Sequence, residues 1–178
     1  MITGHLGVAA AVRSRWPGLS VFWLVPVAVA PDILDFAYVA LGICSPYGLY
    51  SHTVPAAALT GAVLGGIAFL VTGSRSAGLV TAGVVLAHLP LDLVTGHKIF
   101  WPGGPLLGFS LYRRPLLDFL IELPIALAGW WVLRRSGRGP SWATVGAAAL
   151  ALALAQATFD VLPQVKPSAC RGIVQEVP

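Results

Sequence analysis

Apolar residues in this sequence gather in long runs and do not alternate with polar ones. Runs with few or no charged residues cover 53–74, 76–96 and 139–159, and a fourth at 115–133 is equally apolar. About 20 apolar residues are enough for a helix to cross the hydrocarbon core of a bilayer. The pattern therefore predicts membrane-embedded helices over these four runs.

The first fifty residues follow a less regular pattern. Their apolar pieces are short and are interrupted at Pro17, Pro26 and Pro31. Proline removes a backbone donor and breaks or kinks a helix, so we expect a broken helical hairpin here. The predicted class is all-α: one polytopic helical membrane domain over 1–163, with about five membrane-embedded helices, followed by a polar tail at 164–178.

Composition supports the membrane interpretation. The 178-residue chain is 57% hydrophobic and 10% charged, with a mean hydropathy of +0.82. These values are typical of membrane proteins. The calculated pI of about 9.5 does not indicate nucleic-acid binding, because no basic patch interleaved with aromatic residues occurs outside 98–115. The two cysteines, Cys44 and Cys170, have no metal-binding spacing, and the sequence does not pair them.

The ionisable residues are few, and most lie inside or beside the apolar runs. The chain has seven acidic residues and four histidines. Those in or beside apolar runs are Asp32, Asp35, Asp92, Asp118, Glu122, His5, His52, His88 and His97. A carboxylate at membrane depth costs at least about 2.5–3.5 kcal/mol, so such groups face a partner, a cavity or an ion. Mixed histidine and carboxylate ligands suit zinc or a similar metal, and we expect a metal site.

Spacing strengthens this expectation. His88 and Asp92 are four residues apart, and Asp118 and Glu122 repeat the interval on the next charged helix. Residues at this spacing share one helix face. A proline lies within or just after each pair, where it would open the helix near the polar groups. The sequence therefore predicts two polar pairs that face the same interior.

A topology with basic residues on the cytoplasmic side brings the candidate ligands together. The basic residues assigned to that side are Arg13, Arg15, Arg75, Arg134, Arg135 and Arg138. The chain then passes through the membrane so that every candidate ligand reaches the opposite face. We expect the site at the extracytoplasmic side.

Four segments also resemble a known family. They are GHLGVA (4–9), APDILD (30–35), YSHTVP (50–55) and AHLPLDLVTGHKIFWP (87–102). In this order they resemble the YdjM-like inner-membrane proteins (DUF457), which are described as membrane-bound metal-dependent hydrolases. The resemblance covers roughly the first 125 residues. It implies an integral protein of a bacterial-type plasma (inner) membrane and a metal-dependent hydrolase activity.

The chain is more distantly similar to zinc-dependent phospholipase C and P1-type nucleases, whose ligands follow a fixed order along the sequence. The matching residues here are His5, Asp32 or Asp35, His52, His88, Asp92, His97, Asp118 and Glu122. Asp118 stands where those enzymes have histidine. The similarity implies two Zn²⁺ ions, with three as the upper limit, and a catalytic base at Asp32 or Asp35.

The expected reaction is hydrolysis of a phosphoester by a metal-activated water. A site at the bilayer surface favours a phospholipid or lipid-linked substrate. Arg113 and Arg114 would either bind its phosphate or anchor the chain at lipid headgroups. The hydroxyls of Tyr50, Ser51 and Thr95 would either support the ligands or serve as ordinary helix-packing groups.

Two other functions fit the same residues. Carboxylates and histidines on broken helices also build ion or proton pathways and metal transporters. A non-catalytic scaffold would use a structural metal, but such sites are closed and need only four ligands. The large number of candidate ligands favours the hydrolase. The sequence does not determine the oligomeric state.

Overall fold

The computed structural model describes residues 3–111 and 114–139 and positions 141, 150 and 154, and over them the chain is mostly helical. The predicted all-helical class is confirmed. The helices are α1 (Thr3–Arg15), α2 (Val21–Ala28), α3 (Ala30–Ala40), α4 (Val54–Thr72), α5 (Arg75–Leu86), α6 (His88–Thr95) and α7 (Pro115–Arg135), with a 3-10 turn η1 (Pro46–Gly48). Strands β1 (Lys98–Ile99) and β2 (Leu106–Leu107) pair antiparallel in a short hairpin.

Local sequence sets several helix ends. The side chains of Ser20, Thr53 and Ser74 accept hydrogen bonds from backbone N–H groups in the first turns of α2, α4 and α5. These are N-caps, which satisfy donors that have no partner inside the helix. Helix α4 ends at Gly73 in a left-handed conformation (φ 66°), which reverses the chain into α5.

Prolines account for the breaks within the apolar segments. Helices α2 and α3 meet at Val29 with a bend of 62°, and Pro31 lies in the first turn of α3. Helices α5 and α6 are separated at Ala87, close before Pro90, which has no N–H for the carbonyl four residues earlier. By contrast, α7 continues past Pro124 to Arg135. The predicted broken hairpin is therefore present as the bent pair α2–α3.

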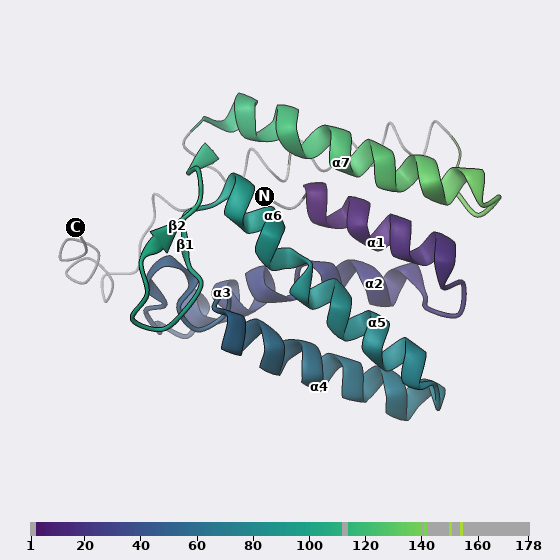
Figure 1. Ribbon diagram of the computed structural model, residues 1–178, viewed down its shortest axis with the longest axis horizontal. Helices are drawn as coiled ribbons and strands as arrows, with labels where there is room; N and C mark the ends of the chain where they lie inside the picture. Colours follow the sequence, from purple (N-terminus) through teal and green to yellow (C-terminus); the bar gives the residue numbers. More distant parts are fainter. Residues whose placement is uncertain (1–2, 112–113, 140, 142–149, 151–153, 155–178) are drawn as a thin grey trace.

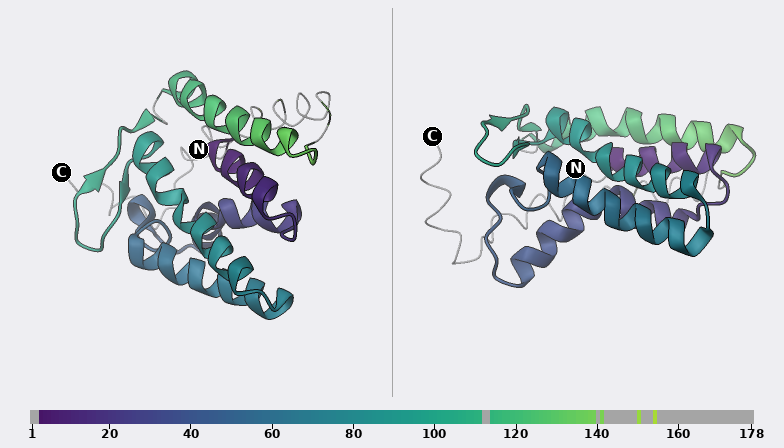
Figure 2. Two further views of the ribbon diagram at one scale, coloured as in Figure 1. Left: turned by 45° about the vertical axis from the view of Figure 1, so that its right-hand side comes forward. Right: turned by 60° about the horizontal axis from the view of Figure 1, so that its bottom comes forward.

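Helix α1 lies between α7 and the neighbouring helices α2 and α5 (Figures 1 and 2). Helices α4 and α5 form an antiparallel hairpin along one side. A compact apolar core joins α1, α2 and α5. Its main residues are Ala9, Leu24, Val27, Ala28, Ala77, Val84 and Val85.

Three segments of the described chain are long and apolar enough to cross a membrane: Val54–Thr72, Arg75–Thr95 and Leu116–Arg135. The bent pair α2–α3 makes a fourth if it counts as one span. The predicted helix at 139–159 lies almost entirely outside the described residues, as does the predicted tail at 164–178.

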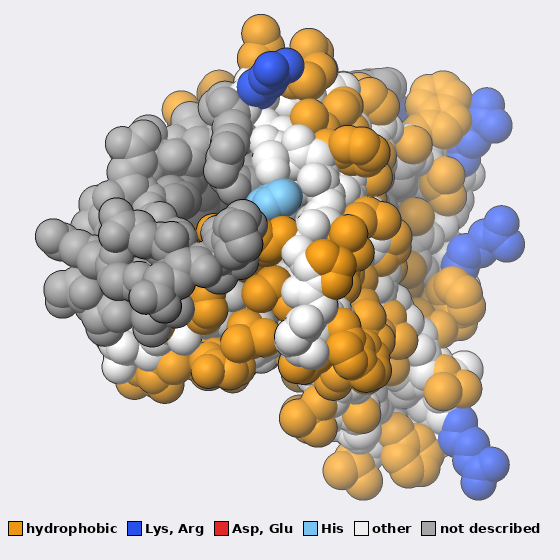
Figure 3. Space-filling model, turned by 60° about the vertical axis from the view of Figure 1, so that its left-hand side comes forward, with side chains coloured by type: hydrophobic (Ala, Val, Ile, Leu, Met, Phe, Trp, Pro, Cys, Tyr) orange, Lys and Arg blue, Asp and Glu red, His pale blue; other side chains and the backbone are white. Residues whose placement is uncertain are grey.

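The described surface carries many large apolar side chains, while several ionisable groups are buried. Hydrophobic side chains cover most of the described face shown in Figure 3. Leu59, Leu70, Val71 and Leu79 on the α4–α5 hairpin are all more than two-thirds exposed. The buried polar set includes His5, His52, His88, Asp92, Asp118 and Glu122. This distribution is the reverse of that in a typical water-soluble domain.

One end of the helix bundle is basic. Arg13 and Arg15 lie in the last turn of α1, and Arg134 and Arg135 lie in the last turn of α7. The turn between α4 and α5, with Arg75, lies at the same end (Figure 1). The buried histidines lie toward the opposite end.

Candidate metal centre

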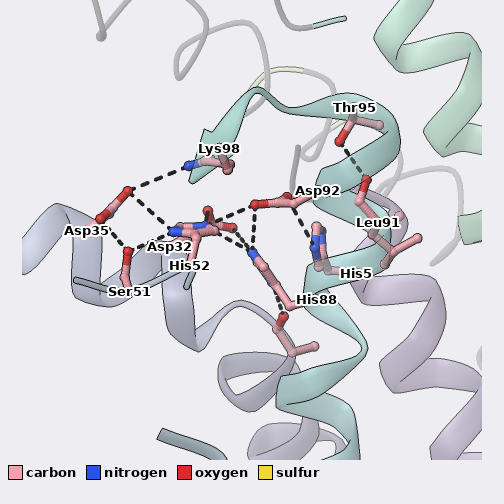
Figure 4. A network of polar contacts seen from close by, with 12 residues as sticks. His5, Asp32, Asp35, Ser51, His52, His88, Leu91, Asp92, Thr95 and Lys98 are labelled. Atoms are coloured by element: carbon pink, nitrogen blue, oxygen red, sulfur yellow. Dashed lines mark hydrogen bonds and ion pairs between the residues drawn. The ribbon is translucent and has the colours of Figure 1, made fainter. Parts of the chain in front are cut away.

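Five ionisable residues from separate parts of the chain meet at the end of the bundle opposite the arginines (Figure 4). They are His5 of α1, Asp32 of α3, His52 just before α4, and His88 and Asp92 of α6. The ligand atoms of His5, His88 and Asp92 all lie within 4.8 Å of one another, and so do those of Asp32, His52 and His88. The two groups share His88.

The break between α2 and α3 orients His88. Its Nδ1 lies 3.0 Å from the carbonyl oxygen of Ala28, the last residue of α2. The final carbonyls of a helix have no partner inside it, so this oxygen is free to accept. Because Nδ1–H donates to Ala28, the lone pair of the neutral His88 ring lies on Nε2, which faces the cluster.

A hydrogen bond with Ser51 fixes the ring of His52, and it too engages the Nδ1 atom. The Oγ atom of Ser51 lies 2.7 Å from His52 Nδ1 and 2.5 Å from Asp35 Oδ1. An ionised carboxylate only accepts, so the Ser51 hydroxyl donates to Asp35 and accepts from Nδ1–H of His52. The lone pair of the neutral His52 ring therefore also lies on Nε2.

The turn before His52 leaves no room for a larger residue at Gly48. This glycine has φ 74°, and its carbonyl accepts the His52 N–H at 2.7 Å. A methyl group at Gly48 would come within 2.7 Å of His52 Nδ1. The turn thus holds the ring against Ser51.

The nitrogens that carry lone pairs are close together. Nε2 of His52 lies 3.2 Å from Nε2 of His88, and Asp92 Oδ2 lies 3.1 Å and 3.5 Å from these two atoms. Two lone-pair nitrogens at this distance repel each other unless a cation or a proton lies between them. Ligand atoms about 2.0–2.1 Å from a tetrahedral zinc are about 3.3 Å apart, close to these separations. Asp32 Oδ1, 3.3 Å from His52 Nε2, fits the same spacing.

Asp92 faces two sides of the cluster. While Oδ2 faces His52 and His88, Oδ1 lies 3.7 Å from Nε2 of His5. Among the described residues, neither oxygen of Asp92 and neither ring nitrogen of His5 has a hydrogen-bond partner, although both residues are buried. A buried polar group without a partner costs about 1–3 kcal/mol. The donor set and these unsatisfied atoms fit a bound cation.

Lys98 of β1 completes the cluster, and sequence reasoning missed it. Its Nζ lies 3.7 Å from Asp35 Oδ2. Burial disfavours the charged form, but the nearby carboxylates of Asp92, Asp35 and Asp32 outweigh it and raise the pKa of Lys98. The only available signal was its position directly after His97.

The structure does not bring all the predicted ligands together. His97 is partly exposed, with Nδ1 3.4 Å from the Gly108 carbonyl oxygen, and belongs to neither group. Asp118 and Glu122 are buried on α7 but also lie outside both groups, and Glu122 Oε2 accepts the N–H of Gly4 at 3.3 Å. Asp35 accepts a hydrogen bond from Ser51 and forms an ion pair with Lys98.

The other residues that the sequence suggested are three hydroxyl residues near the ligands and two arginines expected to bind substrate. Of the three hydroxyl residues, only Ser51 supports a ligand; Thr95 donates to the Leu91 carbonyl of its own helix, and Tyr50 is about half exposed. Arg114 is exposed at the start of α7, whereas Arg113 lies outside the described residues.

The cluster offers two oriented imidazoles, unsatisfied carboxylate oxygens and an ammonium group. Among the described residues of the cluster, three carboxylates, Asp32, Asp35 and Asp92, face one cation, Lys98, which leaves about two negative charges when the histidines are neutral. One divalent cation would balance them. A search for related proteins found no matching family model, no matching curated protein and no matching solved structure.

Proposed function

We propose that this chain is an integral membrane protein with a divalent-metal centre that hydrolyses phosphoesters. The observation that carries the metal assignment is the 3.2 Å separation between Nε2 of His52 and Nε2 of His88. Each ring is held by an independent hydrogen bond that leaves its lone pair on Nε2. A bound cation converts this repulsion into ligation.

The ligands divide naturally into two sets around Asp92. His52, His88 and Asp32 would hold one ion together with Asp92 Oδ2, while His5 and Asp92 Oδ1 would contribute to a second. His88 can serve only one ion, since its Nδ1 is bound to Ala28. This arrangement supports two ions, of which the first has the fuller ligand set.

The proposed chemistry follows from the donors. When bound, a divalent ion lowers the pKa of water and stabilises charge on a phosphoryl oxygen. Asp32 is better suited than Asp35 to accept the water proton, because its buried Oδ2 has no hydrogen-bond partner among the described residues. Asp35 instead orients His52 through Ser51. The similarity to zinc-dependent phospholipase C, which implies a catalytic base at Asp32 or Asp35, agrees with Asp32 in this role.

The exposed surface supports a membrane location. Large apolar side chains point outward along the candidate spans, and the ionisable groups are buried together at one end. The arginines gather at the other end, where Arg134 and Arg135 lie over the rings of Trp130 and Trp131. Arginine and tryptophan are typical of the membrane–water interface. We infer that this end is cytoplasmic.

The candidate ligands lie at the end of the described bundle opposite these arginines. The metal centre would thus open on the extracytoplasmic side.

Helix α3 supports a lipid or lipid-linked substrate. Asp32 lies at the metal centre, whereas its neighbour Ile33 and also Phe36 and Val39 are about half exposed. One helix thus carries both a ligand and an apolar surface suited to lipid. A substrate anchored in the bilayer could reach the centre along α3 without leaving the membrane.

The test is metal content per chain, measured by elemental analysis on detergent-purified protein. We expect one or two zinc-like ions in the wild type, and in His88→Ala the loss of at least the ion that His52, His88 and Asp32 would hold. His97→Ala is the matched control, because the structure places His97 outside both ligand groups, and we expect it to keep the wild-type metal content.

Equal metal content in wild type and His88→Ala would contradict the proposed centre. A wild-type protein without metal would also contradict it and would favour the ion-pathway alternative. Metal loss in His88→Ala alone would justify a screen of phosphoester and phospholipid substrates.

A further inference from the structure

The metal centre has a closed side and an open side. His5, His52, His88 and Asp92 are at most 2% exposed. The rim is formed by Asp32, Asp35 and Lys98, whose side chains are 19%, 26% and 17% exposed. Among the described residues of the cluster, these three are the ones with exposed side-chain surface, so a substrate would approach the buried ligands across them.

Lys98 is poorly satisfied by its neighbours at this rim. Its one ion pair among the described residues is with Asp35 Oδ2 at 3.7 Å. This is longer than the 2.7–3.2 Å of a normal N–H···O hydrogen bond, while an ammonium group has three donors. Figure 4 shows the side chain extending from β1 toward Asp35, beside the Asp32–His52 pair.

Its backbone is fixed by the hairpin. Lys98 pairs with Leu107 of β2, and the Phe100 carbonyl accepts the N–H of Val54 at the start of α4, 2.8 Å away. The strand that carries Lys98 is therefore tied to the helix that follows His52. An ammonium group held in this way is already placed beside the ligands before a substrate arrives.

The positive charge of Lys98 matters because carboxylates surround it. The rim and the interior contain carboxylates, which repel an anionic substrate, and Lys98 is the cation that the described contacts place among them. Arg13, Arg75 and Arg134 lie at the far end of the bundle, too distant to compensate.

We propose that Lys98 binds an anionic oxygen of the substrate's phosphoryl group and so selects phosphoesters over neutral esters. This inference rests on the proposed metal-dependent hydrolase function and assigns its substrate recognition. Lys98 contributes a point charge with free donors, and it needs little rearrangement because its strand is fixed. The alternative is that Lys98 acts only as a counter-ion for the buried carboxylates and does not contact the substrate.

The test compares Lys98→Met, Lys98→Arg and Arg75→Met in zinc-supplemented, detergent-purified protein. Two quantities are measured on each preparation: zinc content by elemental analysis, and affinity for inorganic phosphate by calorimetric titration. Methionine keeps the length of the side chain without its charge. Arg75→Met removes a basic residue from the opposite end of the bundle.

We expect Lys98→Met to keep the wild-type zinc content and to bind phosphate at least about tenfold more weakly, since a hydrogen bond to a charged group is lost. Lys98→Arg should recover most of the affinity, and Arg75→Met should bind as the wild type does. In activity assays with a phosphoester, Lys98→Met should raise KM more than it lowers kcat.

Unchanged phosphate affinity in Lys98→Met at full zinc content would overturn this inference and leave the metal centre intact. Loss of zinc in Lys98→Met would overturn it too, because Lys98 would then act as support for the ligands. Absence of zinc from the wild type would refute the proposed function itself, and this inference with it. The zinc measurement therefore separates the two failures.

Discussion

At the scale of single residues, the proposed metal centre depends on how each histidine is held. His88 is fixed by one carbonyl oxygen at a helix break, and His52 by a serine that is itself bound to a carboxylate. Supports of this kind set both the tautomer and the ring orientation. Changes next to the ligands should therefore weaken metal binding even when the ligands themselves are intact.

Gly48→Ala tests this dependence. The added methyl group would meet His52 Nδ1, the atom that bonds to Ser51, so we expect metal affinity to fall by about 10–100-fold. Gly42→Ala is the control: Gly42 also has a positive φ (71°), but a methyl group there meets nothing within 4 Å. Both variants carry similar backbone strain, and only the first should lose zinc in a chelator competition titration. Equal affinities would show that the turn does not position His52.

At the scale of elements, the contact between α1 and α7 positions His5 against the rest of the cluster. The two helices approach closely at Gly7 and Gly129, where a methyl group on Gly129 would overlap the Gly7 carbonyl oxygen. Small residues at such a crossing allow helix backbones to pack directly, which matters in a membrane where apolar burial drives association only weakly.

Gly129→Ala should therefore destabilise the fold by about 1–3 kcal/mol, as expected for overpacking at a tight contact. The measurement is thermal unfolding in detergent. Gly66→Ala on α4 is the control, because a methyl group there meets nothing within 4 Å and alanine is the better helix former. If Gly129→Ala is as stable as Gly66→Ala, the contact between α1 and α7 is looser than the structure indicates.

At the scale of the whole molecule, the arginines and the candidate metal ligands lie at opposite ends of the described bundle, which gives the proposed membrane orientation a direct test. Trp101, in the hairpin beside the centre, is 60% exposed, and Arg75 begins α5 at the other end. In intact cells, we expect a membrane-impermeant thiol reagent to label Trp101→Cys but not Arg75→Cys. Permeabilised cells should show labelling of both. The reverse pattern in intact cells would place the metal centre on the cytoplasmic side.

Hydropathy and proline positions were sufficient to predict the helical class and the broken hairpin. The long apolar runs appear as α4, as α5 with α6, and as α7, because a buried or lipid-facing backbone must satisfy its own hydrogen bonds. The fifth predicted helix, at 139–159, lies almost entirely outside the described residues, and the membrane itself stays a prediction.

The candidate site was predictable in part. Scarce ionisable residues in apolar runs pointed to His5, Asp32, His52, His88 and Asp92, which the structure brings together. The same reasoning also selected His97, Asp118 and Glu122, which lie outside both ligand groups. Spacing along a helix identifies a shared face, but it does not say whether two faces from different helices reach the same point.

Local composition and the energetics of desolvation were enough to predict helices within 53–74, 76–96 and 115–133 and to identify the ionisable residues that are too costly to bury alone. The different contacts of Asp32 and Asp35, from which their proposed roles follow, and the place of Lys98 at the rim could not be read from the sequence. Those roles depend on hydrogen bonds between residues distant in sequence, and they arise when the bend between α2 and α3 and the β1–β2 hairpin bring these side chains to one end of the bundle.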